Sequence, residues 1–210
     1  MVIATPKAQL ILATRNAHKV GELRDILQPL LPGVDMNRIQ SAAQYDIAEP
    51  IEDAVTFAGN ALIKARQIAE HTGIAAIADD SGICVDVLGG APGIFSARWC
   101  GKHGDDQANL DLLLAQLCDV KDEYRTGYFM CAAALVLPDG REFVREGRMI
   151  GRLRYEAAGE GGFGYDPIFQ PDGYAVTSAE LDPAEKNRIS HRGRAFTELA
   201  PLLAEYVFTQ

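Results

Sequence analysis

The stretch Ile77-Ala78-Asp79-Asp80-Ser81-Gly82 is the most informative part of the chain. It ends an apolar run that starts at Ile74, and it adds two adjacent carboxylates, a hydroxyl and a glycine. This pattern predicts a buried strand that ends in a turn, with charge held in a fixed place. Because neighbouring carboxylates repel each other, a fold usually supplies them with a cation or a hydrogen-bond network. A divalent metal with a phosphate substrate, and an ordinary exposed turn, explain this stretch equally well when it is taken alone.

The composition is that of an ordinary globular protein. The 210 residues can build one sizeable core or two closely packed lobes, and the 48% hydrophobic and 23% charged fractions favour no special class. No apolar segment is long enough to span a membrane, and Met1 to Gln9 lacks a signal-peptide pattern, so we expect a cytoplasmic protein without a membrane partner. The net charge of −9 argues against a nucleic-acid surface but allows a nucleotide substrate.

Hydrophobic periodicity predicts an α/β chain that opens with a strand, a polar loop and a helix. The opening strand is expected at residues 9–14, and the helix that follows it ends at Pro32-Gly33. Further strands are expected at 34–39, 83–88, 128–137 and 141–150, further helices at 52–71, 105–117 and 190–208, and a short helix from Asp182-Pro183.

The helix expected at residues 52–71 carries a polar row at a spacing of four. Glu52, Thr56, Asn60 and Lys64 share one side of such a helix. An acid, a hydroxyl, an amide and a base in one row suit a metal and phosphate site, whereas a solvated polar face is the ordinary alternative. With Asp79 and Asp80, Glu52 makes an acidic set of the kind that magnesium prefers.

Three further segments indicate a phosphorylated, planar ligand. Residues 14–19 join a strand to a helix N-terminus and end in Lys19, which favours an anion. Residues 186–192 hold three cations, a hydroxyl and a histidine before the last helix. Residues 161–167 place two aromatic rings among glycines, which allows close approach to a base. A capped turn, a solvated basic patch and aromatic packing on the core are the respective alternatives.

Six segments in order give the chain a specific resemblance that spans nearly its whole length. It resembles the Ham1-like or RdgB-like inosine/xanthosine triphosphate pyrophosphatases. The matching segments are Leu12-Ala13-Thr14-Arg15-Asn16-Ala17-His18-Lys19, Thr56-Phe57 with Asn60-Ala61 and Lys64-Ala65, Ala78-Asp79-Asp80-Ser81-Gly82, Gly89-Gly90-Ala91-Pro92-Gly93 with Ser96-Ala97-Arg98, Gly162-Phe163-Gly164-Tyr165-Asp166-Pro167, and Ser190-His191-Arg192-Gly193.

The resemblance implies one α/β domain over residues 1–210. Its two lobes would share a mixed twisted sheet, flanked by helices, with a central substrate cleft. It also implies a homodimer and a dependence on Mg²⁺. The implied reaction hydrolyses the nucleoside triphosphates ITP, dITP, XTP and dXTP to a nucleoside monophosphate and pyrophosphate, which keeps deaminated purines out of DNA and RNA.

The resemblance also implies roles for individual residues. Asp80 would be the proton acceptor and a metal ligand, with Glu52 as a second metal ligand. Phe163 and Tyr165 would flank the base, and His191 and Arg192 would recognise the oxo group at purine position 6. The full set of implied substrate contacts is Thr14, Arg15, Asn16, Ala17, His18, Lys19, Ser81, Phe163, Gly164, Tyr165, Asp166, Lys186, His191 and Arg192.

The chain departs from the family pattern at two positions, and two rival functions remain. Many relatives have glycine in place of Arg15, whose larger side chain would either add a phosphate contact or face solvent. Many bacterial relatives have glutamate in place of Gly59, so Glu52 and Asp80 would carry more of the metal binding here. The role of Asp79, as a metal ligand or as a support for Asp80, stays open.

The rival functions are a Maf-type pyrophosphatase acting on modified pyrimidines or dTTP, and a nucleotide-sensing module without turnover.

Overall fold

The computed structural model describes residues 7–209, apart from the side chains of Ala17 and His18. The chain forms two compact units. The first comprises the described residues up to Asp80, Ala132–Gly147 and the residues from Arg192 onward, and the second comprises Ser81–Cys131 and Arg148–His191. No helix among residues 7–209 combines the length and the apolar character that crossing a membrane requires.

A six-stranded mixed sheet organises the chain, in the order β2-β1-β3-β4-β5-β6. The short strand β1 pairs in parallel with β2 and with β3, and β5 pairs antiparallel with β6. The long strands β3, β4 and β5 each continue from one unit into the other. The predicted α/β class with a mixed sheet flanked by helices is confirmed. The strands are β1 (Leu10–Leu12), β2 (Ile39–Ser41), β3 (Ala75–Val85), β4 (Thr126–Val136), β5 (Glu142–Leu153) and β6 (Phe169–Pro171).

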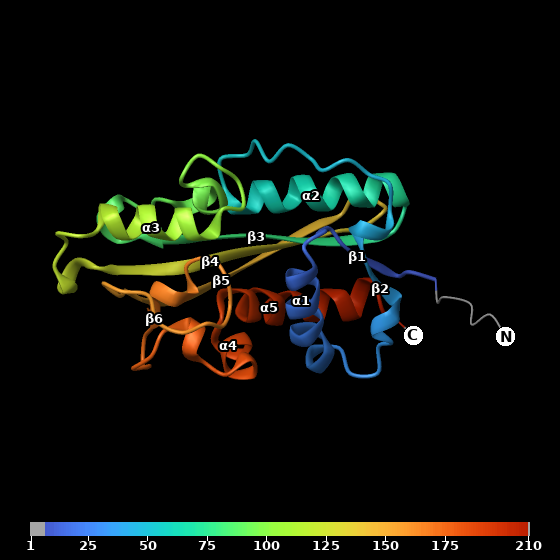
Figure 1. Cartoon of the computed structure of the whole chain (residues 1–210). Coiled ribbons are helices and arrows are strands. Elements are labelled where there is room, and N and C mark those ends of the chain that lie inside the picture. Colours follow the sequence, from blue (N-terminus) through green and yellow to red (C-terminus); the bar gives the residue numbers. More distant parts are fainter. Residues whose placement is uncertain (1–6, 210) are drawn as a thin grey trace. The chain divides into compact units, whose positions relative to one another are not determined.

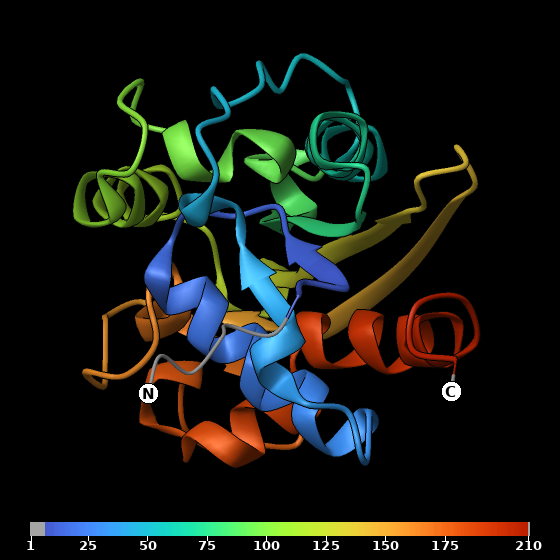
Figure 2. The ribbon, with the colours of Figure 1, turned by 90° about the vertical axis from the view of Figure 1, so that its right-hand side faces the viewer.

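In the first unit, α2 (Phe57–Thr72) lies on one face of the strands, and α1 (Ala17–Leu30) and α5 (His191–Tyr206) lie on the other (Figure 1, Figure 2). Alanines line the contact between α2 and β3, since Ala61 and Ala65 share a buried cluster with Ala76 and Ala78. Small side chains let a helix approach a strand closely, because little volume separates the two backbones. The polar residues of α2 are therefore brought close to Asp80, the last residue of β3 that belongs to this unit.

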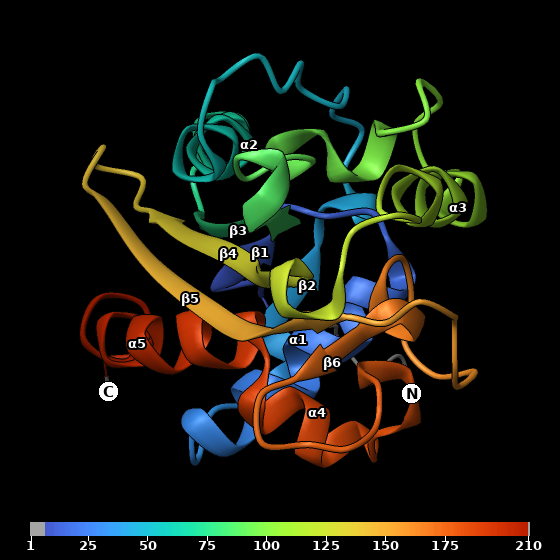
Figure 3. The ribbon, with the colours of Figure 1, turned by 90° about the vertical axis from the view of Figure 1, so that its left-hand side faces the viewer.

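The second unit has its own apolar core. Helix α3 (Asp106–Gln116) lies on one side of the long strands and α4 (Pro183–Ile189) on the other (Figure 3). Leu110 and Leu113 of α3 belong to a buried cluster with Phe129 and Phe169, whose rings meet edge to face with centroids 4.7 Å apart. Tyr165, Ile168 and Ile189 belong to the same cluster, so this core includes residues of the segment 161–191.

Three expected boundaries were wrong. The turn predicted at Asp79-Asp80-Ser81-Gly82 does not form, because β3 runs through it without interruption to Val85. Helix α2 begins at Phe57 and not at Glu52, since the Thr56 side chain caps it by accepting a hydrogen bond from the backbone N–H of Gly59. The strand expected at 34–39 lies further along the chain, because residues 36–38 form a 3-10 turn and β2 spans Ile39–Ser41.

Arg125 is a buried cation held by backbone carbonyls, and it is only 1% exposed. Its Nε donates to the carbonyl of Leu153 at 2.9 Å, and its two Nη atoms donate to the carbonyls of Leu117 and Arg154. Its guanidinium carbon lies 4.1 Å from the centroid of the Tyr155 ring. One side chain thereby joins the end of α3 to the end of β5.

Replacing Arg125 with methionine should lower the free energy of unfolding by about 2–4 kcal/mol, because the partner carbonyls lose charged donors inside the core. Urea unfolding followed by circular dichroism measures the change. The matched control is Arg152→Met, since Arg152 pairs with Asp122 at the surface and should cost at most about 1 kcal/mol. Equal stability of the two variants would contradict the assigned role of Arg125.

Candidate active site

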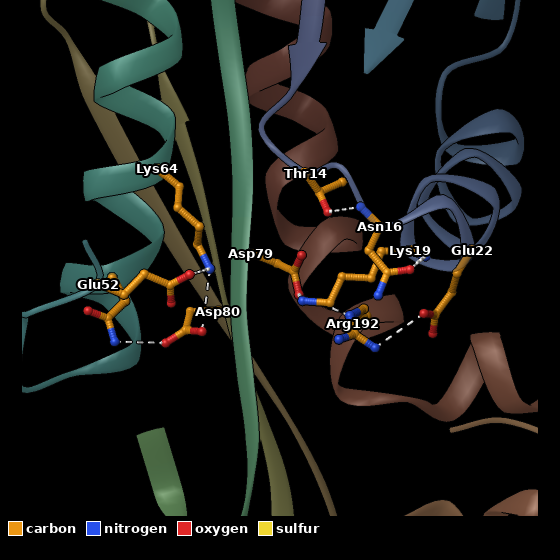
Figure 4. A network of polar contacts seen from close by, with 10 residues as sticks. Thr14, Asn16, Lys19, Glu22, Glu52, Lys64, Asp79, Asp80 and Arg192 are labelled. Atoms are coloured by element: carbon orange, nitrogen blue, oxygen red, sulfur yellow. Dashed lines mark hydrogen bonds and ion pairs between the residues drawn. The ribbon is translucent and has the colours of Figure 1, made fainter. Parts of the chain in front are cut away.

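Asp79 and Asp80 project to opposite sides of β3 (Figure 4). Successive side chains of a strand alternate between the two faces of its sheet, so adjacent residues cannot share a face. The Asp79 side chain is 2% exposed and the Asp80 side chain is 13% exposed. The two carboxylates therefore belong to two separate sets of polar contacts, which we call the Asp80 set and the Asp79 set.

The Asp80 set consists of Asp80, Asn60, Lys64 and Glu52. The Asn60 Nδ2 atom donates to Asp80 Oδ2 at 3.1 Å. The Lys64 Nζ atom lies 3.5 Å from Asp80 Oδ1 and 3.3 Å from Glu52 Oε1, so one ammonium bridges the two carboxylates. Although Glu52 precedes the helix, its side chain still meets Lys64, as the polar row in the sequence had indicated.

Asn60 connects the Asp80 set to the loop that carries Glu52. It is 1% exposed, and its Oδ1 atom accepts a hydrogen bond from the backbone N–H of Ala54 at 3.0 Å. A Cβ atom on Gly59 would lie 2.6 Å from the Cβ of Ala54, so this loop leaves no room for a larger residue there. A glutamate at position 59, which the family resemblance led us to expect, would require the backbone around Ala54 to move.

Burial raises the pKa of the Asp80 carboxyl, with smaller raising contributions from Glu52 and Asp79, against the opposing charge of Lys64 and the hydrogen bond from Asn60. Burial alone would lower the pKa of Lys64, but the charges of Asp80, Asp79 and Glu52 outweigh it and raise that pKa. Asp80 thus combines a raised proton affinity with a fixed orientation, which suits a proton acceptor.

The Asp80 set suits a cation whose remaining coordination positions are filled by substrate phosphates and water. Among residues 7–209, no three His, Cys, Asp or Glu side chains are grouped so that they could hold a metal ion by themselves. Magnesium is commonly held by one or two carboxylates together with substrate phosphates and water. The Lys64 ammonium, placed between Glu52 and Asp80, shows that this position already stabilises positive charge.

The Asp79 set lies on the other face of β3 and includes Lys19, Arg192 and Glu22 (Figure 4). Asp79 Oδ2 lies 3.5 Å from Lys19 Nζ and 3.0 Å from Arg192 Nε. Arg192 also contacts Glu22 at 3.2 Å through Nη1. Burial alone would raise the pKa of Asp79, but the charges of Lys19, Arg192 and Lys64 and the Arg192 hydrogen bond hold it well below its usual range.

The predicted loop before the helix is shorter than residues 14–19, because α1 begins at Ala17 and contains Lys19 in its first turn. The backbone N–H of Asn16 donates to Thr14 Oγ1 at 3.2 Å, and the backbone N–H of Lys19 donates to Asn16 Oδ1 at 3.3 Å. Arg15 and Asn16 are exposed. The expected substrate contacts of Ala17 and His18 involve side chains that lie outside the described part of the structure.

In the second unit, Asp166 organises the aromatic and glycine segment. It is 4% exposed, and its Oδ2 atom accepts hydrogen bonds from the backbone N–H of Phe163 at 2.9 Å and from Lys186 Nζ at 2.5 Å. Lys186 Nζ also lies 5.5 Å from the centroid of the Phe163 ring. A Cβ at Gly162, where φ is +72°, would overlap Asp166, so the loop requires glycine at this position.

The expected base-contact residues have different exposures. Phe163 is 39% exposed, whereas Tyr165 is 5% exposed and donates its hydroxyl to the carbonyl of Ser96 at 2.8 Å. His191 is 6% exposed and stacks on Phe129, with centroids 4.9 Å apart and an interplanar angle of 14°. Of these three candidates, Phe163 offers the most accessible ring. Ser81 follows Asp80 on β3 and is partly exposed, and Gly164 donates its backbone N–H to Asp106 at 3.2 Å.

Sequence reasoning did not assign Asn60, Lys64 or Glu22 to the site. The sequence does indicate Asn60 and Lys64 as candidates, since they follow Glu52 in the polar row at a spacing of four. Glu22 had only its position three residues after Lys19, which places two side chains on one face of a helix. Its partner Arg192 lies 170 residues further along the chain, so no local pattern could identify the pair.

Comparisons with known proteins identify the family to which this chain belongs. The Ham1 family model matches residues 10–202. A dITP/XTP pyrophosphatase of Streptomyces coelicolor is 60% identical over 197 residues, covering 94% of this chain and 98% of the relative. A corresponding protein of Leifsonia xyli, also named dITP/XTP pyrophosphatase, is 54% identical over 195 residues, covering 93% of this chain and 95% of the relative.

Solved structures show the same relationship. The crystal structure of a nucleoside-triphosphatase, also named dITP/XTP pyrophosphatase, from Mycobacterium abscessus has a TM-score of 0.74 at 49% identity, covering 91% of this chain and 98% of the other. A HAM1 protein from Coxiella burnetii has a TM-score of 0.83 at 36% identity, covering 94% and 99%. Together with the family match over most of the chain, these similarities establish that this protein belongs to the Ham1 family.

Proposed function

We propose that this chain hydrolyses deaminated purine nucleoside triphosphates, namely ITP, dITP, XTP and dXTP, to the nucleoside monophosphate and pyrophosphate. The proposal includes a requirement for Mg²⁺, held by Glu52 and Asp80 together with the substrate phosphates. The observation that carries it is the pair of carboxylates arranged about one ammonium in the Asp80 set, within a chain of the Ham1 family. A homodimer and a cytoplasmic location are proposed from the family resemblance.

In this account, Asp80 accepts the proton of a water molecule that attacks the α-phosphorus. A bond forms between the water oxygen and the α-phosphorus, and the bond to the oxygen that bridges to the β-phosphorus breaks. The raised pKa of Asp80 and its hydrogen bond from Asn60 support a group that can take up a proton and is held in one orientation. Bound Mg²⁺ would neutralise the charge of the phosphates next to Asp80.

Two ammonium groups, those of Lys19 and Lys64, are proposed to contact the phosphates and to stabilise the leaving pyrophosphate. Lys19 lies in the first turn of α1, next to a helix N-terminus that favours anions. Lys64 lies beside Asp80 and offsets part of the negative charge of Asp80 and Glu52. A charge that develops on the leaving oxygen in the transition state would be countered by these fixed ammonium groups.

Base selection is proposed to depend on the oxo group at purine position 6. A donor from His191 or Arg192 would gain a hydrogen bond from inosine or xanthine. The amino group of adenine would instead meet another donor and leave a buried group unsatisfied, which costs binding energy. Phe163 is the proposed stacking surface, and its loop is supported by the ion pair of Asp166 and Lys186.

A pyrophosphate-release screen tests the reaction and the substrate class together. ITP, dITP, XTP, dXTP, ATP, GTP and dTTP are supplied with and without Mg²⁺, and pyrophosphate and orthophosphate are measured separately. We expect Mg²⁺-dependent pyrophosphate release with kcat/KM for ITP at least about 100-fold above that for ATP. Orthophosphate as the product, or a preference for dTTP, would contradict the proposal, and tight binding without turnover would indicate a nucleotide sensor.

The variant Asp80→Asn should keep its fold but lose about 10²–10⁴-fold in kcat for ITP, because an amide cannot take up the proton of the attacking water. Steady-state kinetics and the Tm measure the two effects. Asp139→Asn is the matched control, since Asp139 likewise pairs with a cation, Arg141, but in an exposed turn. Near-normal turnover of the Asp80→Asn variant would remove Asp80 from the role of proton acceptor.

The variant Asn60→Ala should reduce kcat/KM for ITP by about 10–100-fold, as is usual when a group that orients a metal ligand is lost. The physical reason is that Asp80 loses its Nδ2 donor and the loop before Thr56 loses its anchor at Ala54. Asn37→Ala removes an exposed asparagine of the same unit and serves as the control. Equal activity of the two variants would show that Asn60 does not orient Asp80.

A further inference from the structure

Asp79 joins three segments that are far apart in the sequence. Lys19 comes from the first turn of α1, Asp79 from β3, and Arg192 from the first turn of α5. The hydrogen bond between Arg192 Nε and Asp79 Oδ2 spans 113 residues and is buried. Because a carboxylate removed from water needs compensation, both cations are required partners of Asp79 and not incidental neighbours.

Glu22 is the second carboxylate of the Asp79 set and pairs with Arg192. It lies three residues after Lys19 on α1 and contacts Nη1 of Arg192 at 3.2 Å, with 13% of its side chain exposed. Arg192 is therefore tied to α1 directly through Glu22 and indirectly through Asp79 and Lys19. The set contains two cations and two anions, so its formal charges balance. Removing one charge would leave the opposite charge in a dry environment without its partner.

We propose that Asp79 is a positioning residue, which fixes the Lys19 ammonium and the Arg192 guanidinium relative to each other. This inference rests on the proposed function, in which Lys19 meets the phosphates and Arg192 meets the base. Asp79 points away from the Asp80 set (Figure 4) and so takes no part in holding the metal ion or the attacking water. It acts on the nucleotide through both cations, one toward each end of the ligand.

Asp79→Asn should raise KM for ITP about tenfold or more while kcat changes by less than about threefold, since interaction energies within one ion-pair network reach this size. The Asp80 set keeps its contacts in this variant, so kcat should change little. Asp139→Asn is the matched control for replacing a carboxylate that pairs with an arginine, and its KM should not change.

Two competitors separate the two ends of the ligand. Inorganic tripolyphosphate tests the phosphate end, inosine monophosphate tests the base end, and calorimetry gives the Kd of each. Asp79→Asn should weaken both competitors. Glu22→Gln, which touches only the Arg192 side, should weaken inosine monophosphate and leave tripolyphosphate unchanged. This second variant keeps the inference testable if Asp79→Asn does not fold.

A double-mutant cycle with Lys19→Met decides whether Asp79 acts through Lys19. In the Lys19→Met background, Asp79→Asn should change the Kd for tripolyphosphate by less than about twofold, because the coupled partner is already gone. Equal effects of Asp79→Asn in both backgrounds, or unchanged Kd values for both competitors, would overturn the inference. If the wild-type protein binds both competitors but releases no pyrophosphate from ITP, the proposed function fails separately.

Discussion

The alternation of side chains along β3 is the constraint on which the rest of the site depends. Two adjacent carboxylates on an extended strand must face opposite sides of the sheet, and their separation reduces their mutual repulsion. Each side then supplies its own cations, with Lys64 beside Asp80, and Lys19 and Arg192 beside Asp79. One short stretch of strand thereby supports a proposed metal and water position on one face and a cation-positioning contact on the other.

The apolar framework explains why these partners are within reach. Alanines of α2 and β3, such as Ala65 and Ala78, share one buried cluster, and this lets the polar row of the helix approach Asp80. The N-cap at Thr56 starts α2 late enough for Glu52 to lie in a loop, which Asn60 fastens through Ala54. The positions of the reactive groups are thus consequences of helix capping and of small side chains in the core.

Much of the architecture could be predicted, because helix caps and hydrophobic periodicity are local signals. The short helix after Asp182 forms as expected, and Gly73 ends α2 in the left-handed conformation. The turn at Asp79-Asp80-Ser81-Gly82 was the main error, since these residues have the local propensities of a turn. What keeps them extended includes the contact with Arg192, whose position more than a hundred residues away carries no local signal. The hydroxyl of Tyr165 donates to the backbone carbonyl of Ser96, a partner 69 residues away that no local sequence pattern identifies.

Asp80 is proposed to bind the metal ion, whereas Asp79 is proposed only to position Lys19 and Arg192, and Mn²⁺ binding tests this difference most directly. Electron paramagnetic resonance can report Mn²⁺ affinity in the presence of a saturating ITP analogue whose α- and β-phosphorus atoms are bridged by an imido group. We expect Asp80→Asn to weaken Mn²⁺ binding by about tenfold or more, because a metal ligand is lost, whereas Asp79→Asn should stay within about threefold of the wild type. Equal weakening by both variants, or normal Mn²⁺ binding by Asp80→Asn, would contradict it.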